Sequence, residues 1–126
     1  MYKLVNHSVR VLAVENDPVL SELLAEIFTD AGFEFQLHAS ADDLILTVAD
    51  FEPNVILLDY LLGKLSGGDY CKMLKGHPLY QNIPVIVYSA LPTSYFADKD
   101  YGCDLFLAKP FDIDELLSEI SRLALA

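Results

Sequence analysis

Four short apolar runs in this chain are each followed by polar residues that could bind a cation or phosphate. The runs and the residues after them are 11–14 with Glu15 and Asn16, 55–58 with Asp59, 83–88 with Ser89, and 105–108 with Lys109. Carboxylate and amide oxygens suit a hard cation such as Mg2+, and an ammonium or a hydroxyl can hold phosphoryl oxygens. An aspartate can also accept a phosphoryl group covalently. The set therefore predicts an aspartate that accepts phosphate with the help of Mg2+, if the fold brings the four places together.

The run that ends at Asp59 is the central one. Its four apolar residues, Val55 to Leu58, follow Pro53 and precede a glycine-containing loop, a pattern typical of a strand buried on both faces. In an open parallel sheet, ligands bind outside the carboxyl ends of the strands, so Asp59 would lie where ligands bind. An aspartate that only ends a strand and begins a turn is the alternative, and this stretch alone does not choose between the two.

The composition predicts one globular domain across residues 1–126, with its core at about 9–123 and no output domain after the last helix. The chain is 53% hydrophobic and 21% charged, which excludes a disordered chain. No apolar run is long enough to cross a bilayer, and the first residues lack a signal-peptide pattern, so we expect a cytoplasmic location. Cys71 and Cys103 have no CxxC spacing and no histidine at metal-ligand spacing, which favours reduced, packed thiols.

The charge distribution excludes two classes of partner. The net charge is −11, and the segment from Val11 to Gly63 holds eleven acidic residues and no Lys or Arg. A surface of this kind repels nucleic acid and anionic membranes, so we expect neither as a direct partner. Solubility alone would explain the acids, but some of them could also converge on a cation.

Strands and helices are expected to alternate along the chain. The expected strands cover residues 11–14, 33–38, 55–58, 83–88 and 104–108, with 33–38 at an edge. The expected helices cover residues 18–31, 40–51, 66–75, 91–101 and 112–123. Helix starts are indicated by capping signals, which are Asp17 before Pro18, Ser40 with Asp43, and Asp112 with Glu115. The alternation predicts an α/β fold with a parallel sheet, helices on both faces and right-handed crossovers.

Over nearly its whole length, from Val9 to about Leu123, the chain resembles the receiver domain of a bacterial two-component response regulator. The motifs that carry the resemblance are Val-Leu-Ala-Val-Glu-Asn-Asp-Pro (11–18), Leu-Leu-Asp-Tyr-Leu-Leu-Gly-Lys-Leu-Ser-Gly (57–67), Pro-Val-Ile-Val-Tyr-Ser-Ala (84–90) and Leu-Phe-Leu-Ala-Lys-Pro-Phe (105–111). Each motif is weak alone, but the four in this order are specific. The resemblance implies a flavodoxin-like, doubly wound, five-stranded parallel sheet of order 2-1-3-4-5 with five helices in three layers.

The resemblance also implies what the strand-end residues do. Asp59 would take a phosphoryl group from a sensor histidine kinase or a phosphotransfer protein, and Lys109 would bind that group. The implied Mg2+ ligands are Glu15, Asn16, Asp59 and the backbone carbonyl of Leu61. Apart from accepting and hydrolysing its own phosphoryl group, the chain would not be an enzyme.

A switch is implied as well. Ser89 would engage the phosphoryl group and, with the aromatic Phe106, couple it to the face formed by segment 91–101, strand 104–108 and the last helix. A downstream protein or a second copy of the chain would dock on that face. Phe106 could instead be an ordinary core residue, since aromatic side chains in strands usually pack. The Lys109–Pro110 peptide bond is expected to be cis.

One departure from the family pattern leaves a second function open. Asn16 stands where the family usually has an acid, so it keeps an oxygen but lacks a full charge. We therefore expect Mg2+ to bind weakly. The alternative is a degenerate receiver that acts as a protein-interaction module without phosphorylation.

Two other classes that use a similar sheet fit the sequence less well. A phosphatase of the haloacid dehalogenase type would need a second aspartate where Leu61 stands. A flavodoxin would need a phosphate-binding loop where Glu15 and Asp17 would repel phosphate.

Overall fold

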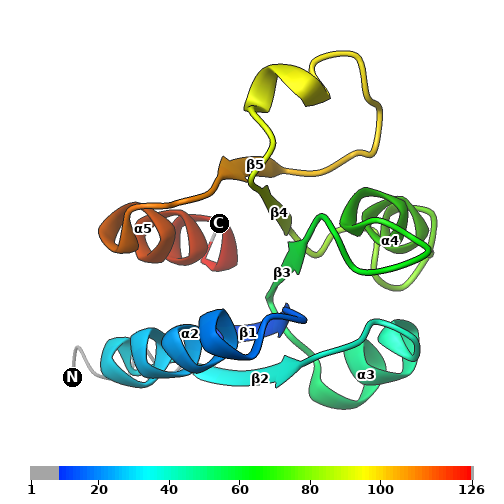
Figure 1. The fold of residues 1–126 in the computed structure, drawn as a ribbon. Helices are drawn as coiled ribbons and strands as arrows, with labels where there is room; N and C mark the ends of the chain where they lie inside the picture. Colours follow the sequence, from blue (N-terminus) through cyan, green and yellow to red (C-terminus); the bar gives the residue numbers. More distant parts are fainter. Residues whose placement is uncertain (1–8, 126) are drawn as a thin grey trace.

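The computed structural model describes residues 9–125, which form a five-stranded parallel sheet between two layers of helices (Figure 1). The strands are β1 (Arg10–Val14), β2 (Glu34–His38), β3 (Val55–Asp59), β4 (Val85–Ser89) and β5 (Leu105–Ala108). The helices are α2 (Pro18–Ala31), α3 (Leu44–Phe51), α4 (Gly67–Lys75), the 3-10 helix η1 (Thr93–Phe96) and α5 (Ile113–Ala124). The strand order is β2-β1-β3-β4-β5. The predicted fold and strand order are therefore confirmed.

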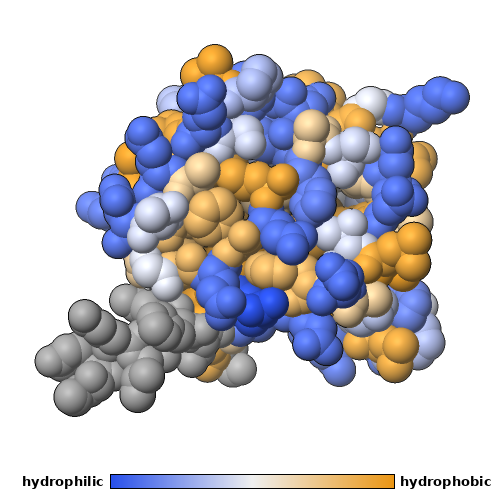
Figure 2. Space-filling view, turned by 90° about the horizontal axis from the view of Figure 1, so that it is seen from below, coloured by the Kyte–Doolittle hydropathy of each residue, from blue (hydrophilic) through white to orange (hydrophobic). Residues whose placement is uncertain are grey.

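The core has two parts, one on each face of the sheet. Helices α2 and α5 cover one face, and α3 and α4 cover the other (Figure 1). Every residue of the central strands β3 and β4 is buried, as expected for strands covered on both sides. The two edge strands, β2 and β5, have half-buried residues, and Figure 2 shows apolar side chains gathered within a hydrophilic rim on the β2 side of the molecule.

The start and end of α2 follow directly from the sequence. The Asp17 side chain accepts a hydrogen bond from the Val19 backbone N–H at 3.0 Å, and Pro18 occupies the first turn. Gly32 ends the helix in the left-handed conformation with φ of 78°, which glycine adopts without a steric cost. The prediction for this helix is confirmed, and Asp17 is occupied as its cap.

The predicted capping box at Ser40 and Asp43 is wrong. Ser40 Oγ accepts from the Asp42 N–H at 3.1 Å within a turn, and α3 begins only after Asp43, whose side chain makes no cap bond. A true capping box lies instead at the start of α4, where Ser66 and Asp69 each bond to the other's backbone N–H, at 3.0 and 2.9 Å. At α5, Asp112 caps alone by accepting from the Asp114 N–H. Both Ser40 and Ser66 fit the motif, so the motif alone did not say which serine begins a helix.

The helix expected over residues 91–101 is present only as the 3-10 helix η1, of four residues. One of its two aromatic side chains packs inward: Phe96 is buried and its ring stacks on that of Phe106, with centroids 4.4 Å apart. Tyr95, by contrast, remains 43% exposed. A segment with few periodic apolar positions cannot bury one side of a longer helix, so packing of single aromatic residues decides its path.

Two further sequence expectations can be compared with this fold. Cys71 and Cys103 are free thiols, the first buried and the second half-buried, as predicted. Within residues 9–125, none of the helices has both the length and the apolar character that crossing a membrane requires.

The first turn of α4 lies directly against the end of β3. The Gly67 N–H donates to the Tyr60 carbonyl at 2.8 Å, and a Cβ at Gly67 would lie 2.3 Å from the backbone oxygen of Asp59. Only glycine permits this approach of two backbone segments. The packing of α4 therefore depends on the same few residues that carry Asp59.

Gly67→Ala is expected to lower the free energy of unfolding by about 2 kcal/mol or more, because the added methyl meets backbone that cannot move cheaply. Gly76→Ala, at the other end of α4, is the matched control. Its Cβ would meet nothing closer than 3.4 Å, so the change should stay within about 0.5 kcal/mol. Urea unfolding of both variants measures the difference, and equal stabilities would contradict the close approach at Gly67.

Candidate functional site

The register of the parallel strands brings the predicted residues to one edge of the sheet. The last aligned pairs are Val14 with Leu58, Asp59 with Tyr88, and Ser89 with Ala108. Glu15 directly follows β1 and Lys109 directly follows β5, so both lie beside the ends of β3 and β4. Residues from four separate strands thus meet at the carboxyl edge, where ligands bind in sheets of this kind.

One ammonium group lies between two buried carboxylates. Lys109 Nζ is 3.3 Å from Asp59 Oδ2 and 3.6 Å from Glu15 Oε1. Glu15 is 1% exposed and Asp59 is 5% exposed. Their mutual repulsion is strong in such a site, because little water is present to screen it. The Lys109–Pro110 bond is cis, as expected.

Each oxygen of the Glu15 carboxylate accepts a hydrogen bond within the protein. Its Oε1 accepts a hydrogen bond from the Tyr88 hydroxyl, and its Oε2 accepts from the Asp17 N–H at 2.9 Å. Burial, and next the hydrogen bond to Glu15, raise the pKa of Tyr88 well above its usual range, so the phenol stays protonated and donates. Both Glu15 oxygens therefore bind protein partners.

Tyr88 is a site residue that the sequence reasoning missed. A signal for it was present, because Tyr88 is the one residue with a hydroxyl in the apolar run before Ser89, and a buried tyrosine hydroxyl usually finds a partner. Since side chains alternate along a strand, Tyr88 and Ser89 point to opposite faces of the sheet. Only the pairing of β3 with β4 shows that Tyr88 lies on the same face as Asp59.

Asn16 and Leu61 cover the outer side of the site. Asn16 Nδ2 donates to the Leu61 backbone carbonyl at 3.3 Å, and the Leu61 N–H donates to Asp59 Oδ1 at 3.2 Å. The Asn16 side-chain amide and the Leu61 side chain are both exposed. To offer oxygens to a cation, the Asn16 amide must rotate and the Leu61 carbonyl must lose this hydrogen bond.

The donor types nevertheless fit Mg2+. Carboxylate, amide and backbone oxygens converge beside Asp59, and Mg2+ commonly binds one or two carboxylates and keeps several waters. Within residues 9–125, no three or more His, Cys, Asp or Glu side chains are grouped as a metal site on their own. A cation here would therefore rely on neutral oxygens and water beside Asp59.

Ser89 lies on the other side of the same strand end. It is buried, its Oγ accepts from the Leu91 N–H at 3.0 Å, and its carbonyl accepts from the Lys109 N–H at 2.7 Å. Ser89 thus holds the start of the segment that leads to η1. Phe106, half-buried in β5, stacks on Phe96 of η1 and packs against the core cluster on that face, so it contacts the same segment from the core side.

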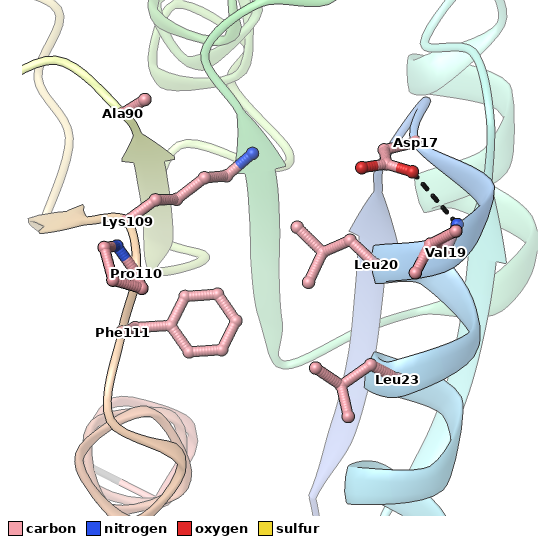
Figure 3. Close-up of a pocket in the computed structure, with 8 residues that line it drawn as sticks. All are labelled: Asp17, Val19, Leu20, Leu23, Ala90, Lys109, Pro110 and Phe111. Atoms are coloured by element: carbon pink, nitrogen blue, oxygen red, sulfur yellow. Dashed lines mark hydrogen bonds between the residues drawn. The ribbon is translucent and has the colours of Figure 1, made fainter.

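An apolar pocket of about 440 Å³ opens next to this edge, between α2 and the turn before α5 (Figure 3). Leu20 and Leu23 line it on one side and Phe111 lies opposite them, while Lys109 extends its ammonium toward the end of β3. The carboxylate site therefore borders an apolar pocket that has the Lys109 ammonium at one end.

The surroundings of Asp59 disfavour its negative charge. Burial, followed by repulsion from Glu15, raises the pKa of Asp59, and the attraction of Lys109 and the Leu61 hydrogen bond offset this only in part. Ionisation of Asp59 therefore lowers the free energy of unfolding. A cation bound at the site would remove that cost.

Asp59→Asn is expected to stabilise the protein at neutral pH by about 1 kcal/mol, or about 4 °C in the unfolding midpoint. Because the pKa of Asp59 is higher in the folded than in the unfolded state, the cost of its charge is present above the folded pKa. It is lost as pH falls through that pKa toward the unfolded value. The stability gap between variant and wild type should thus narrow on acidification. Unfolding of wild type and Asp59→Asn, measured from neutral pH downward, tests this prediction, with Asp112→Asn as a control. A stability difference that widens on acidification would contradict the raised pKa of Asp59.

Comparison with known proteins agrees with this geometry. The profile of the response regulator receiver domain matches residues 11–121. The DNA-binding dual master transcriptional regulator RpaA of Synechocystis is 30% identical over an alignment of 118 residues, and the alignment covers 90% of this chain and 48% of RpaA. The chain thus spans about half the length of the curated relatives it matches.

Solved structures resemble the chain over almost all of their length. The receiver domain of a signal transduction histidine kinase from Syntrophus aciditrophicus has a TM-score of 0.83 at 28% identity, covering 92% of this chain and 89% of that one. The receiver domain of the sensor histidine kinase PA1611 from Pseudomonas aeruginosa, which has a magnesium ion coordinated in its active-site cleft, shares the fold with a TM-score of 0.82 at 22% identity and covers 94% of this chain and 98% of that one. The chain therefore belongs to the family of response regulator receiver domains, the signalling modules of two-component systems.

Proposed function

We propose that Asp59 accepts a phosphoryl group from a sensor histidine kinase or a phosphotransfer protein. The observation that carries this proposal is the position of the Lys109 ammonium, 3.3 Å from Asp59 Oδ2 at the carboxyl edge of the sheet. A fixed positive charge beside a carboxylate is what a phosphoryl group needs as its oxygens approach. The donor would be a phosphorylated histidine in the cytoplasm, because receiver domains of two-component systems work with histidine kinases.

The transfer itself forms one bond and breaks one. An oxygen of Asp59 attacks the phosphorus, and the P–N bond to the donor histidine breaks as the P–O bond forms. The imidazole leaves with the electron pair and takes a proton from solvent. Lys109 offsets the negative charge brought to Asp59, and the Ser89 hydroxyl donates to a phosphoryl oxygen.

Bound Mg2+ would supply further positive charge for the same phosphoryl oxygens. The ligands would come from Asp59, Asn16 and the Leu61 carbonyl, with Glu15 reached through a metal-bound water. Each supplies oxygen, the element that Mg2+ prefers. Support for such a site comes from PA1611, whose receiver domain has magnesium in its active-site cleft.

Ser89 and Phe106 would pass the change in Asp59 to the surface formed by η1, β5 and α5. Ser89 Oγ accepts a hydrogen bond from the Leu91 N–H. A phosphoryl oxygen that draws this hydroxyl toward Asp59 would compete with that hydrogen bond. Because Phe106 stacks on Phe96 of η1, a shift of residues 90–96 would reach both aromatic rings. The output would be docking of a downstream protein or of a second copy, by a shift of population between two states.

A receiver that acts without phosphorylation is the second candidate. It is favoured by Asn16, which lacks the charge of an acid, and by Glu15, whose two oxygens already have protein partners. In that case the η1-β5-α5 surface would bind its partner in one fixed state. The two candidates differ in whether Asp59 can be modified.

Incubation with a small phosphodonor and Mg2+, followed by intact mass measurement, tests the first candidate. We expect a mass gain of one phosphoryl group in the wild type and in Asp112→Asn, which alters the cap of α5 and leaves Asp59, Ser89 and Lys109 unchanged. The gain should be absent in Asp59→Asn. A folded wild-type protein that gains no mass from several donors would leave only the second candidate.

Asn16→Asp is expected to increase Mg2+ affinity by about tenfold, or about 1.4 kcal/mol. The new carboxylate adds a full charge and no longer donates to the Leu61 carbonyl, so that carbonyl becomes free to bind the ion. Titration calorimetry with MgCl2 measures the change. Asn82→Asp adds the same charge at an exposed position before β4 and should leave the affinity unchanged. Equal affinities in wild type and Asn16→Asp would show that Asn16 does not weaken the site.

A further inference from the structure

We propose that the Tyr88 hydroxyl is a positioning group that holds Glu15 for Lys109 and away from a cation, and thereby sets the metal affinity of the site. The proposal rests on the proposed function for the presence of Mg2+. Tyr88 itself would touch neither the metal nor the phosphoryl group. Its effect would pass entirely through Glu15.

The ring of Tyr88 has little freedom to move. The residue is fully buried, its ring meets Phe111 edge-on at a centroid distance of 5.9 Å, and Lys109 Nζ lies 4.6 Å from the ring centre. Strand pairing fixes its backbone beside Asp59. The hydroxyl therefore stays at the inner side of the site, where its hydrogen bond to Glu15 Oε1 is also buried.

This hydrogen bond competes with any metal-bound water for the same oxygen. Glu15 Oε1 already receives the Tyr88 hydroxyl and faces Lys109 Nζ at 3.6 Å, while Oε2 receives the Asp17 N–H. Of the about four lone-pair positions of a carboxylate, two accept hydrogen bonds and a third faces Lys109, and the Glu15 side chain is 0% exposed. Little of this carboxylate is therefore open to a hydrated ion. The negative charge of Glu15 is thereby directed into the protein.

Removal of the hydroxyl would reverse this. In Tyr88→Phe the ring still packs on Phe111, but the buried Oε1 lacks one donor, and a buried charged group that lacks a donor is costly. A water bound to Mg2+ is a strong donor that could take the vacant position. We therefore expect Tyr88→Phe to bind Mg2+ about tenfold more tightly than the wild type.

Titration calorimetry with MgCl2 on the full chain tests the proposal. Tyr60→Phe is the matched control, because it removes a hydroxyl that bonds to Tyr101 at 2.9 Å, one residue past Asp59 but away from Glu15. Its affinity should equal that of the wild type. In a Glu15→Gln background, Tyr88→Phe should cause no further change in Mg2+ affinity, since the hydroxyl acts only through the Glu15 carboxylate. A purely structural role of Tyr88 would give the same change in both backgrounds.

The outcomes separate this inference from the proposed function. If Asn16→Asp tightens Mg2+ binding and Tyr88→Phe leaves it unchanged or weaker, the inference fails and the proposed function stands. If Tyr88→Phe tightens binding but Asp59 takes no phosphoryl group in any variant, phosphorylation fails and the inference stands. If Tyr88→Phe, folded by circular dichroism, binds no Mg2+ at all, the inference is overturned.

Discussion

The site depends on one ammonium group, that of Lys109, placed between two buried carboxylates. Glu15 and Asp59 end neighbouring strands, and each would be unfavourable as an isolated buried charge. Lys109 reaches both from the end of β5, and its cis bond to Pro110 belongs to the turn that carries it there. The chemistry proposed for Asp59 and the stability of this edge are therefore two results of the same charge balance.

This receiver differs from the usual family pattern in the negative charge beside Asp59. The acid that the family usually has at position 16 is an amide here, and the remaining acid, Glu15, is bound by Tyr88, Lys109 and the Asp17 backbone. Both features reduce the negative charge that is available to a cation. The amide at position 16 also leaves one negative charge fewer beside Asp59, which Glu15 already repels. Weak metal binding and a tolerable buried charge cluster would thus have a common origin.

The segment between β4 and β5 also departs from the expected regular structure. A single 3-10 turn, η1, and a connecting loop stand where a short helix over residues 91–101 was expected, and aromatic rings provide the packing. Tyr60, the residue after Asp59, contacts Phe96 of η1 and bonds to Tyr101 in the following loop. The residue next to Asp59, the proposed phosphoacceptor, and residues of the proposed docking surface therefore share one aromatic cluster.

The sequence by itself determined the buried strands, the α2 caps and the identity of the residues at the strand ends, because these follow from local periodicity and capping chemistry. The strand order came from the resemblance to receiver domains that the four motifs carry. Tertiary structure alone decided that Ser66 and not Ser40 forms a capping box, that residues 91–101 hold only a short turn, and that Tyr88 bonds to Glu15. The bond from Tyr88 to Glu15 depends on strand pairing, such as that of Asp59 with Tyr88. The position of the capping box depends on the packing of α4 against the end of β3. A pattern of neighbours along the sequence does not contain that information, since the free energy of such contacts depends on which segments pack together.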